Sequence, residues 1–133
     1  MDIEAAARRW ANVLREAWAA RDIDRFGALY AEGTPFRGPF SEPESAVEHM
    51  RRAFELGDAA PDVWVGEPLV SGERASVEWW GIVTLDGEPH SFAGTAWLRF
   101  DNGGRVVEEH DYWQAASGRM EPWPGWVGRG DPL

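Results

Sequence analysis

The hydrophobic positions in the first part of the chain recur with the spacing of helices. From Ile3 to Ala20 apolar residues return every three or four positions, with arginines mainly on the other faces, which predicts an amphipathic helix. Asp22 can cap a short second helix, and the segment from Thr34 to Phe40 is predicted as a short irregular strand or loop. The run Ser41-Glu42-Pro43-Glu44 combines a capping box with an early proline. A third helix should therefore follow this run and end near Leu56.

After Pro61 the pattern changes to the alternation of polar and apolar residues that is typical of strands. Four strands are predicted, at Val63–Val70, Ala75–Leu85, Glu88–Asp101 and Arg105–Gln114. The pair Asp86-Gly87 favours a tight hairpin and the next connection is also short, so the last three strands should form an antiparallel meander. Three helices followed by a strongly curved antiparallel sheet make an α+β fold.

The composition narrows the class of protein. The length of 133 residues fits one domain, which we expect over residues 1–116. A tail rich in Trp, Pro and Gly follows over residues 117–133; we expect it to pack on the domain or on a partner subunit, and the alternative is disorder. The chain has no cysteine and no lysine, which excludes disulfides, thiolate chemistry, iron–sulfur ligation and a lysine Schiff base.

Charge and hydropathy exclude some partners. A formal net charge of −10 argues against nucleic acid and anionic membranes as partners. No apolar run approaches the roughly 18 residues of a membrane span, and the acidic N-terminus is unlike a signal peptide. We therefore expect a cytoplasmic protein. The three histidines are scattered without metal-ligand spacing, so no metal site and no cofactor are expected.

Six short stretches, in this order and spacing, carry a resemblance to a known family. They are Trp18–Asp24, Leu29–Glu32, Pro35–Phe40, Ala75–Trp80, Leu98–Asp101 and Glu109–Trp113. Together they resemble the SnoaL-like branch of the nuclear transport factor 2 (NTF2)-like superfamily, a branch of small bacterial proteins. The resemblance implies a cone-shaped fold in which helices and a concave sheet enclose an apolar pocket. Relatives include a ketosteroid isomerase, a limonene-epoxide hydrolase, a scytalone dehydratase, polyketide cyclases and proteins without known activity, so the fold alone does not assign a function.

Strand alternation sorts the side chains onto two faces of the sheet. Closing the first hairpin with Leu85 opposite Glu88, and the second with Phe100 opposite Arg105, aligns the last three strands. The face that we assign to the pocket holds Val77, Trp79, Gly81, Val83, His90, Phe92, Gly94, Ala96, Leu98, Glu109, Asp111 and Trp113. Because this face includes Gly81 and Gly94, we expect room for a ligand above them.

Asp111 is the predicted catalytic residue. It lies in the middle of a strand on the apolar face, where desolvation would raise its pKa toward neutrality and suit general acid–base catalysis. The resemblance implies the same, because the epoxide hydrolase and the cyclases use a similarly placed aspartate. The alternative is that Asp111 pairs with an arginine and only supports the fold.

The remaining catalytic residues of those relatives are missing here. The isomerase pattern would need acidic or tyrosine side chains where this chain has Leu14, Gly38 and Ala96. Trp79 and Gly81 stand at the hydrolase positions, and Trp18 and Ala19 stand at the dehydratase positions. A site with a single acid, as in a cyclase, is the pattern that remains.

Eight further residues are predicted to bind the substrate: Trp18, Tyr30, Phe40, Trp79, His90, Phe92, Glu109 and Trp113. Glu109 could form an acid–base pair with Asp111, or could pair with Arg99 or Arg105 instead. Tyr30 could donate a hydrogen bond into the pocket or be a core aromatic residue. His49 is expected to be exposed on the third helix, and His90 lies too far along its strand to bond with Asp111.

Two functions fit these residues. The first is a cofactor-independent isomerase, cyclase, dehydratase or hydrolase that uses Asp111 on a small apolar or aromatic molecule. The second is a ligand-binding or dimerisation module of the same fold without catalysis.

The opposite face of the sheet predicts self-association. It exposes Trp80, Ile82, Trp97 and Tyr112, which is more apolar surface than a monomer usually leaves in water. We expect a homodimer through this outer face, as in many relatives. The alternative is that the tail from Pro122 to Val127 folds back over these side chains.

Overall fold

The structure is a computed structural model that describes residues 2–126. Its first two helices are confirmed. Helix α1 (Ile3–Ala20) begins where the Asp2 carboxylate accepts a hydrogen bond from the Glu4 amide at 3.2 Å. Helix α2 (Ile23–Gly27) begins where Asp22 accepts one from the Arg25 amide at 3.1 Å.

Helix α3 (Ala46–Glu55) starts later than expected. Its cap is Ser45, whose side chain accepts a hydrogen bond from the Glu48 amide at 3.3 Å, so the predicted capping box at Ser41 is wrong. Ser41 instead accepts a hydrogen bond from the Gly38 amide at 2.9 Å within the preceding loop. The helix cannot begin earlier because residues 44–45 are extended and paired in the sheet.

Seven strands form one curved sheet: β1 (Pro35–Arg37), β2 (Glu44–Ser45), β3 (Asp62–Val65), β4 (Leu69–Ser71), β5 (Arg74–Leu85), β6 (Glu88–Phe100) and β7 (Val106–Ser117). Their order is β2-β1-β7-β6-β5-β3, and β4 also pairs with β5. The pair β1–β7 is parallel and the others are antiparallel, so the sheet is mixed rather than purely antiparallel. The predicted strand Val63–Val70 is two strands, because the chain leaves the ladder over residues 66–68.

The register between β5 and β6 is confirmed, with Leu85 opposite Glu88. The predicted register between β6 and β7 is wrong by two residues. Phe100 lies opposite Val106 instead of Arg105, and a bulge between Arg99 and Phe100 adds the second residue of offset. Asp111 therefore lies opposite Ala96, and Gly94 lies opposite Trp113. A shift of two residues keeps every side chain on its face, so the assignment of faces survives the error.

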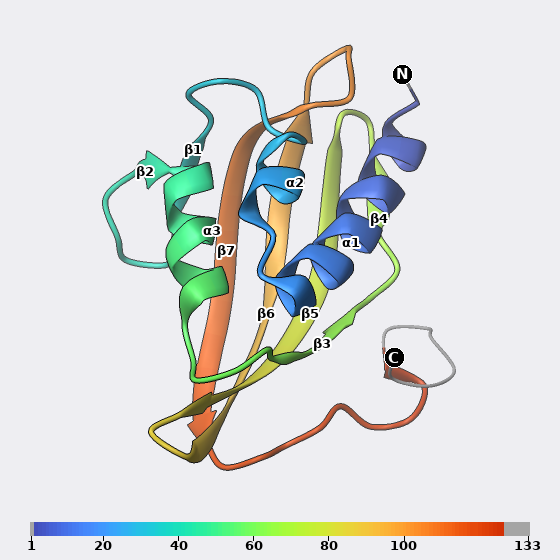
Figure 1. Cartoon of the computed structure of the whole chain (residues 1–133). Helices are drawn as coiled ribbons and strands as arrows, with labels where there is room; N and C mark the ends of the chain where they lie inside the picture. The colour runs from blue at the N-terminus through green and yellow to red at the C-terminus, as the bar shows by residue number, and fades with distance from the viewer. Residues whose placement is uncertain (1, 127–133) are drawn as a thin grey trace.

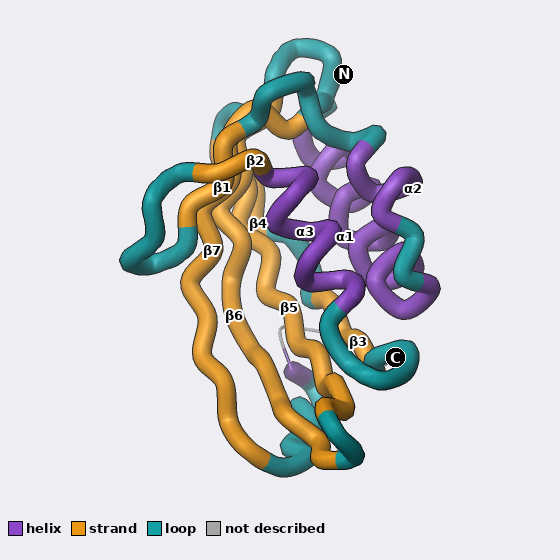
Figure 2. The backbone as a smooth tube through the Cα atoms, turned by 60° about the vertical axis from the view of Figure 1, so that its left-hand side comes forward, coloured by secondary structure: helices purple, strands orange, loops and turns teal. Residues whose placement is uncertain are grey.

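The helices cover one face of the sheet and leave the far ends of β5, β6 and β7 uncovered (Figures 1 and 2). The main core lies between the two layers, with Trp10, Phe26, Phe54, Val77 and Leu98 among its buried side chains. This packing holds α1 and α3 over the same concave face of the sheet, with a space between them. None of the described helices is long and apolar enough to cross a membrane.

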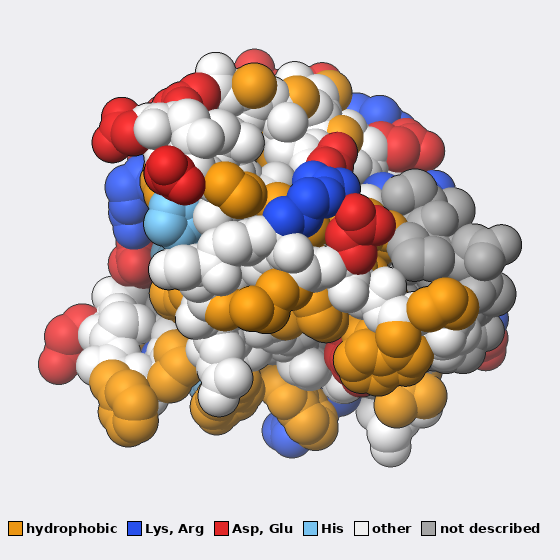
Figure 3. Space-filling model, turned by 90° about the horizontal axis from the view of Figure 1, so that it is seen from below, with side chains coloured by type: hydrophobic (Ala, Val, Ile, Leu, Met, Phe, Trp, Pro, Cys, Tyr) orange, Lys and Arg blue, Asp and Glu red, His pale blue; other side chains and the backbone are white. Residues whose placement is uncertain are grey.

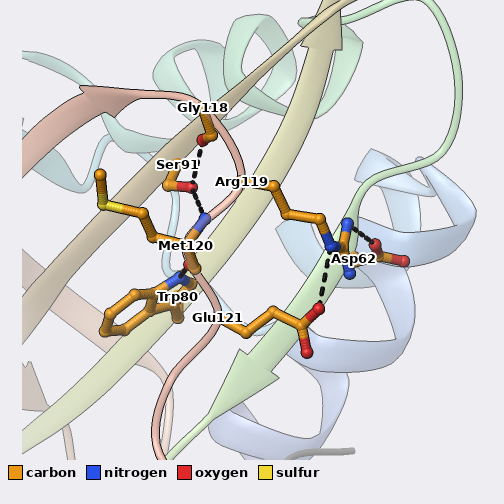
Figure 4. Close-up of polar contacts among 7 residues, drawn as sticks. All are labelled: Asp62, Trp80, Ser91, Gly118, Arg119, Met120 and Glu121. Carbon is orange, nitrogen blue, oxygen red and sulfur yellow. Dashed lines mark hydrogen bonds and ion pairs between the residues drawn. The ribbon is translucent and has the colours of Figure 1, made fainter.

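After β7 the chain runs across the outer face of the sheet. The indole of Trp80 donates a hydrogen bond to the Met120 carbonyl at 2.8 Å, and Ser91 bonds both Gly118 and Met120 at 2.8 Å (Figure 4). Arg119 pairs with Asp62 at 2.7 Å and with Glu121 at 2.9 Å (Figure 4).

Trp126 completes this covering and forms a second apolar cluster with Trp64 and Ile82, against which Trp80 packs. Ile82 is thereby buried and Trp80 is partly buried under the chain's own tail. The expected dimer face is therefore reduced to Trp97 and Tyr112, which are 50% and 55% exposed. Val127, the last residue of the predicted covering segment, lies outside the described residues.

Candidate functional site

A cavity of about 300 Å³ lies between α1, α3 and the concave face of the sheet. Its walls are mostly apolar and include six tryptophan and phenylalanine rings from the helices and strands, beside Met50, Leu56 and Val83. Leu56 and Trp113 are 41% and 43% exposed, so they mark its opening. Hydrophobic side chains are exposed across this end of the molecule, which also holds the β5–β6 hairpin (Figure 3). A space of this size and lining suits a small apolar ligand.

Asp111 is the one carboxylate among the described residues that line the cavity. It extends from the inner face of β7 and is only 5% exposed. Its Oδ1 atom has no hydrogen-bond partner, and no ion pair with an arginine is found for it within residues 2–126. The alternative that Asp111 is a structural ion-pair partner therefore has no support in the described residues.

A second carboxylate lies behind the first, away from the cavity. Glu109 is 1% exposed and shares the inner face of β7 with Asp111. The hydroxyl of Tyr30 donates a hydrogen bond to its Oε1 atom, and the indole of Trp10 donates one to the Tyr30 hydroxyl at 3.0 Å. The alternative that Glu109 pairs with Arg99 or Arg105 is not found among the described residues, and Arg99 instead binds Glu108 on the opposite face at 3.0 Å. Tyr30 and Glu109 thus support the cavity wall without lining it.

Burial shifts the pKa of both carboxyls upward. It raises the pKa of Asp111 well above its usual range, and the negative charge of Glu109 raises it further, while the indole of Trp79 opposes both effects. Burial also raises the pKa of Glu109, but hydrogen bonds from Asp111 and Tyr30 oppose this rise. The upward shift is therefore the larger one for Asp111.

The space expected above the two glycines is filled by indole rings. A β-carbon on Gly81 would lie 2.7 Å from Cζ2 of Trp18, and one on Gly94 would lie 2.8 Å from Cζ2 of Trp79. The two rings meet edge to face at 5.8 Å, and both line the cavity. The N–H groups of both rings are buried without a hydrogen-bond partner in the described structure, and the indole of Trp79 acts on Asp111, whose pKa it lowers.

Helix α3 adds polar groups that the sequence analysis missed. His49 was expected in solvent, but its ring stacks on Phe36 at 3.7 Å and also lines the cavity. Its Nδ1 atom lies 3.4 Å from Glu44, which also pairs with Arg52, and burial lowers the pKa of His49. Its spacing of three residues after the buried Ala46 could have revealed this position.

The structure brings together part of the predicted site. Trp18, Trp79, Phe92 and Trp113 line the cavity with Asp111. Phe40 does not, because it lies fully exposed in the loop between β1 and β2. His90 lies opposite Val83 and Ser117 and is also outside the lining.

Several lining residues from α1, α3 and the end of α3 were not predicted from the sequence: Trp10, Leu14, Met50, Arg52, Ala53, Phe54 and Leu56. Among the described residues, no cluster of three or more His, Asp or Glu side chains could hold a metal ion.

Solved structures with the same architecture come from several proteins. An epoxide hydrolase of the limonene-epoxide hydrolase type from Mycobacterium tuberculosis has a TM-score of 0.65 at 14% identity, covering 83% of this chain and 84% of that one. A candidate ketosteroid isomerase from Kribbella flavida has a TM-score of 0.62 at 22% identity, covering 96% of both chains. A Catenulispora acidiphila protein with a ketosteroid isomerase-like fold, in complex with trimethylamine, has a TM-score of 0.63 at 15% identity, covering 77% and 83%.

These likenesses establish the fold. The comparison with curated proteins finds no match. The model of the SnoaL-like domain matches residues 8–109, which include both helical walls of the cavity and Glu109. The chain belongs to the SnoaL-like domain family and has its NTF2-like fold.

Proposed function

We propose that this protein is a cofactor-independent enzyme in which Asp111 transfers protons to and from a small apolar molecule. The observation that carries the proposal is a buried carboxyl on the wall of an apolar cavity, without a cation to hold it as a structural ion pair. A carboxyl with a raised pKa is an effective general acid or base near neutral pH.

The lining of the cavity suggests what the ligand presents. Asp111 lies on the cavity wall with a raised pKa and can donate its proton, so the ligand should carry an oxygen that accepts a hydrogen bond. The rest of the lining is hydrophobic and aromatic, which favours a flat apolar body. A small cyclic ketone, alcohol or epoxide combines these features.

One carboxyl suffices for isomerisation, intramolecular aldol cyclisation, dehydration or addition of water. In each case the proton that Asp111 gives to the substrate oxygen is balanced by one that returns from carbon or from water. The likeness in fold to an epoxide hydrolase and to ketosteroid isomerase-like proteins fits this range of reactions.

The test is turnover of a panel of small epoxides, β-hydroxyketones and enones by the wild-type chain and two variants. Asp111→Asn should lower turnover by roughly 10²–10⁴-fold, the usual contribution of a general acid or base. Glu108→Gln is the matched control, because Glu108 lies one position away on the opposite face of β7. Equal turnover by wild type and Asp111→Asn would refute the role of Asp111.

The second candidate is a ligand-binding module without catalysis. The observation in its favour is that Asp111 is the sole carboxyl among the described residues that line the cavity, so no second carboxyl there could act as its acid or base partner. In that case cyclic ketones or alcohols should bind and quench tryptophan fluorescence, and none of the panel should be turned over.

We also propose that two copies associate through the part of the outer face that the tail leaves open. Trp97 and Tyr112 stay half exposed there and, with Arg74 and His110, line a shallow groove. Exposed aromatic rings of this kind are enriched at interfaces between proteins.

A further inference from the structure

The carboxyl groups of Glu109 and Asp111 lie together in the core and cannot both be charged at low cost. They are 1% and 5% exposed, and neither has an ion-pair partner in the described part of the chain. Two buried like charges repel strongly, so such a pair holds one proton between its members. The chemistry of the site depends on which member holds it.

Hydrogen bonding around the pair is unequal. Glu109 accepts a hydrogen bond from Tyr30, whose oxygen is itself oriented by the Trp10 indole at 3.0 Å. A donor at this position stabilises a carboxylate, and the buried Tyr30 holds its own proton because burial and the charge of Glu109 raise its pKa well above the usual range. Asp111 has no such support: its Oδ1 atom has no hydrogen-bond partner, and the Trp79 indole lowers its pKa by less than burial and the charge of Glu109 raise it.

We propose that Glu109, held by Tyr30, is a positioning residue that keeps the shared proton on Asp111, so that Asp111 meets the substrate as an acid. This inference rests on the proposed function of Asp111 and deepens it. It selects substrates whose reaction begins with protonation of an oxygen, over those whose reaction begins with loss of a proton from carbon.

The proton balance follows from this arrangement. Asp111 gives its proton to the substrate oxygen as a carbon–oxygen bond breaks or a carbonyl is polarised, and Asp111 becomes a carboxylate. Two neighbouring carboxylates are then unfavourable, so Asp111 takes a proton back from the substrate carbon or from attacking water. Glu109 stays charged and Tyr30 stays protonated throughout.

Other ionisable groups near the pair do not reverse this assignment. His110, on the outer face of β7, acts on Glu109 in the direction that favours its charged form. From α3, His49 and Arg52 line the cavity, and both interact with Glu44. The residues of β6 opposite the pair are Ala96 and Leu98, which do not ionise.

The test is a pH titration of the side-chain carboxyl carbons by NMR in the wild type and three variants without ligand. In the wild type the Asp111 carbon should titrate well above its usual range, and the pair should titrate in two separate steps. Glu109→Gln removes the neighbouring charge, so the Asp111 midpoint should move to lower pH. Tyr30→Phe removes the donor, so the higher step should move from the Asp111 carbon toward the Glu109 carbon.

Glu108→Gln is the control and should leave the Asp111 titration unchanged, because its carboxylate lies on the opposite face and binds Arg99. Both test substitutions preserve size, and circular dichroism checks their fold. An Asp111 midpoint in the usual range in the wild type, or one unmoved by Glu109→Gln and Tyr30→Phe, would overturn the proposal. The titration needs no substrate, so a shared proton without turnover of the panel would refute the proposed enzyme and leave the proton assignment standing.

Discussion

The two faces of β7 place the same kinds of side chain in opposite surroundings. On the outer face Glu108 accepts hydrogen bonds from His110 at 2.6 Å and Arg99 at 3.0 Å, and these lower its pKa. One position further along, Glu109 faces the core with Asp111, and burial raises the pKa of both. The pKa values of acidic residues adjacent in sequence therefore shift in opposite directions, because alternation sends one side chain outward and the next inward.

The two faces also contribute differently to the free energy of folding. The outer pairs lie at the surface and contribute little, whereas two unpaired buried carboxyls oppose folding. Groups that oppose folding persist where they serve a function. The unpaired carboxyls of the inner face therefore fit the role proposed for Asp111, whereas part of the outer face is a packing surface for the tail.

The largest expected effect concerns that packing surface. Trp126→Ala should lower the free energy of unfolding by about 3 kcal/mol, as for other buried tryptophans, because it empties the second cluster. Urea denaturation measures the change. Trp123→Ala is the control, since Trp123 is 63% exposed in the same tail and should matter by less than about 0.5 kcal/mol. Equal effects would mean that the tail does not pack on the outer face.

A smaller loss is expected on the inner face from added bulk. Gly81→Ala places a β-carbon against the ring of Trp18 and should cost about 1–3 kcal/mol through overpacking. It should also weaken ligand binding, because the displaced ring lines the cavity. Ser76→Ala, on the outer face of the same strand, should change stability by less than about 0.5 kcal/mol. Thermal unfolding compares the two, and an unaffected Gly81→Ala variant would contradict the close contact.

The two faces of β7 should also respond oppositely to pH. A carboxyl with a raised pKa when folded contributes stability that is present below its unfolded pKa and is lost as pH rises through the folded value. Asp111→Asn should therefore flatten the fall in Tm toward alkaline pH and raise Tm there by about 4 °C, the effect of about 1 kcal/mol in a domain of this size.

Glu108→Gln should flatten the fall in Tm toward acidic pH, because a carboxyl with a lowered pKa contributes stability that is lost as pH falls. Calorimetry at a series of pH values measures both the acidic and the alkaline fall in Tm. A Tm that falls equally toward alkaline pH in wild type and Asp111→Asn would show that Asp111 is not protonated in the folded chain.

Much of the fold could be predicted because it depends on local period. The spacing of apolar residues predicts the helix over residues 3–20, and strand alternation predicts which side chains of β5, β6 and β7 face inward. The assignment of inward-facing side chains stayed correct although the register of β7 was wrong by two residues. The cap of α3 could not be chosen from sequence, because Ser41 and Ser45 both precede a glutamate by three residues. Pairing of residues 44–45 with β1 decides between them.

The site was harder to predict from the sequence than the fold, because its polar contacts join segments that are distant in sequence. Asp111 could be placed on the inner face by alternation, but the bond from Tyr30 to Glu109 spans 79 positions of sequence. His49 was misplaced since its burial depends on Phe36, whose strand pairs in parallel with β7. Such contacts follow from tertiary packing, which single-sequence periodicity does not contain.

The smallest effect on folding, and the sharpest on assembly, is expected from Trp97→Glu on the open part of the outer face. Trp97 is 50% exposed, so the folded monomer should change in stability by less than about 0.5 kcal/mol. At an interface, however, the new carboxylates would be buried without a partner, and self-association should be lost.

The wild type should sediment as a dimer at micromolar concentration. The dimer should be tighter in high salt, because salt screens the repulsion between copies that each carry a net charge of −10. Trp97→Phe should keep the dimer, and a wild-type monomer at high concentration and high salt would show that the tail alone covers this face.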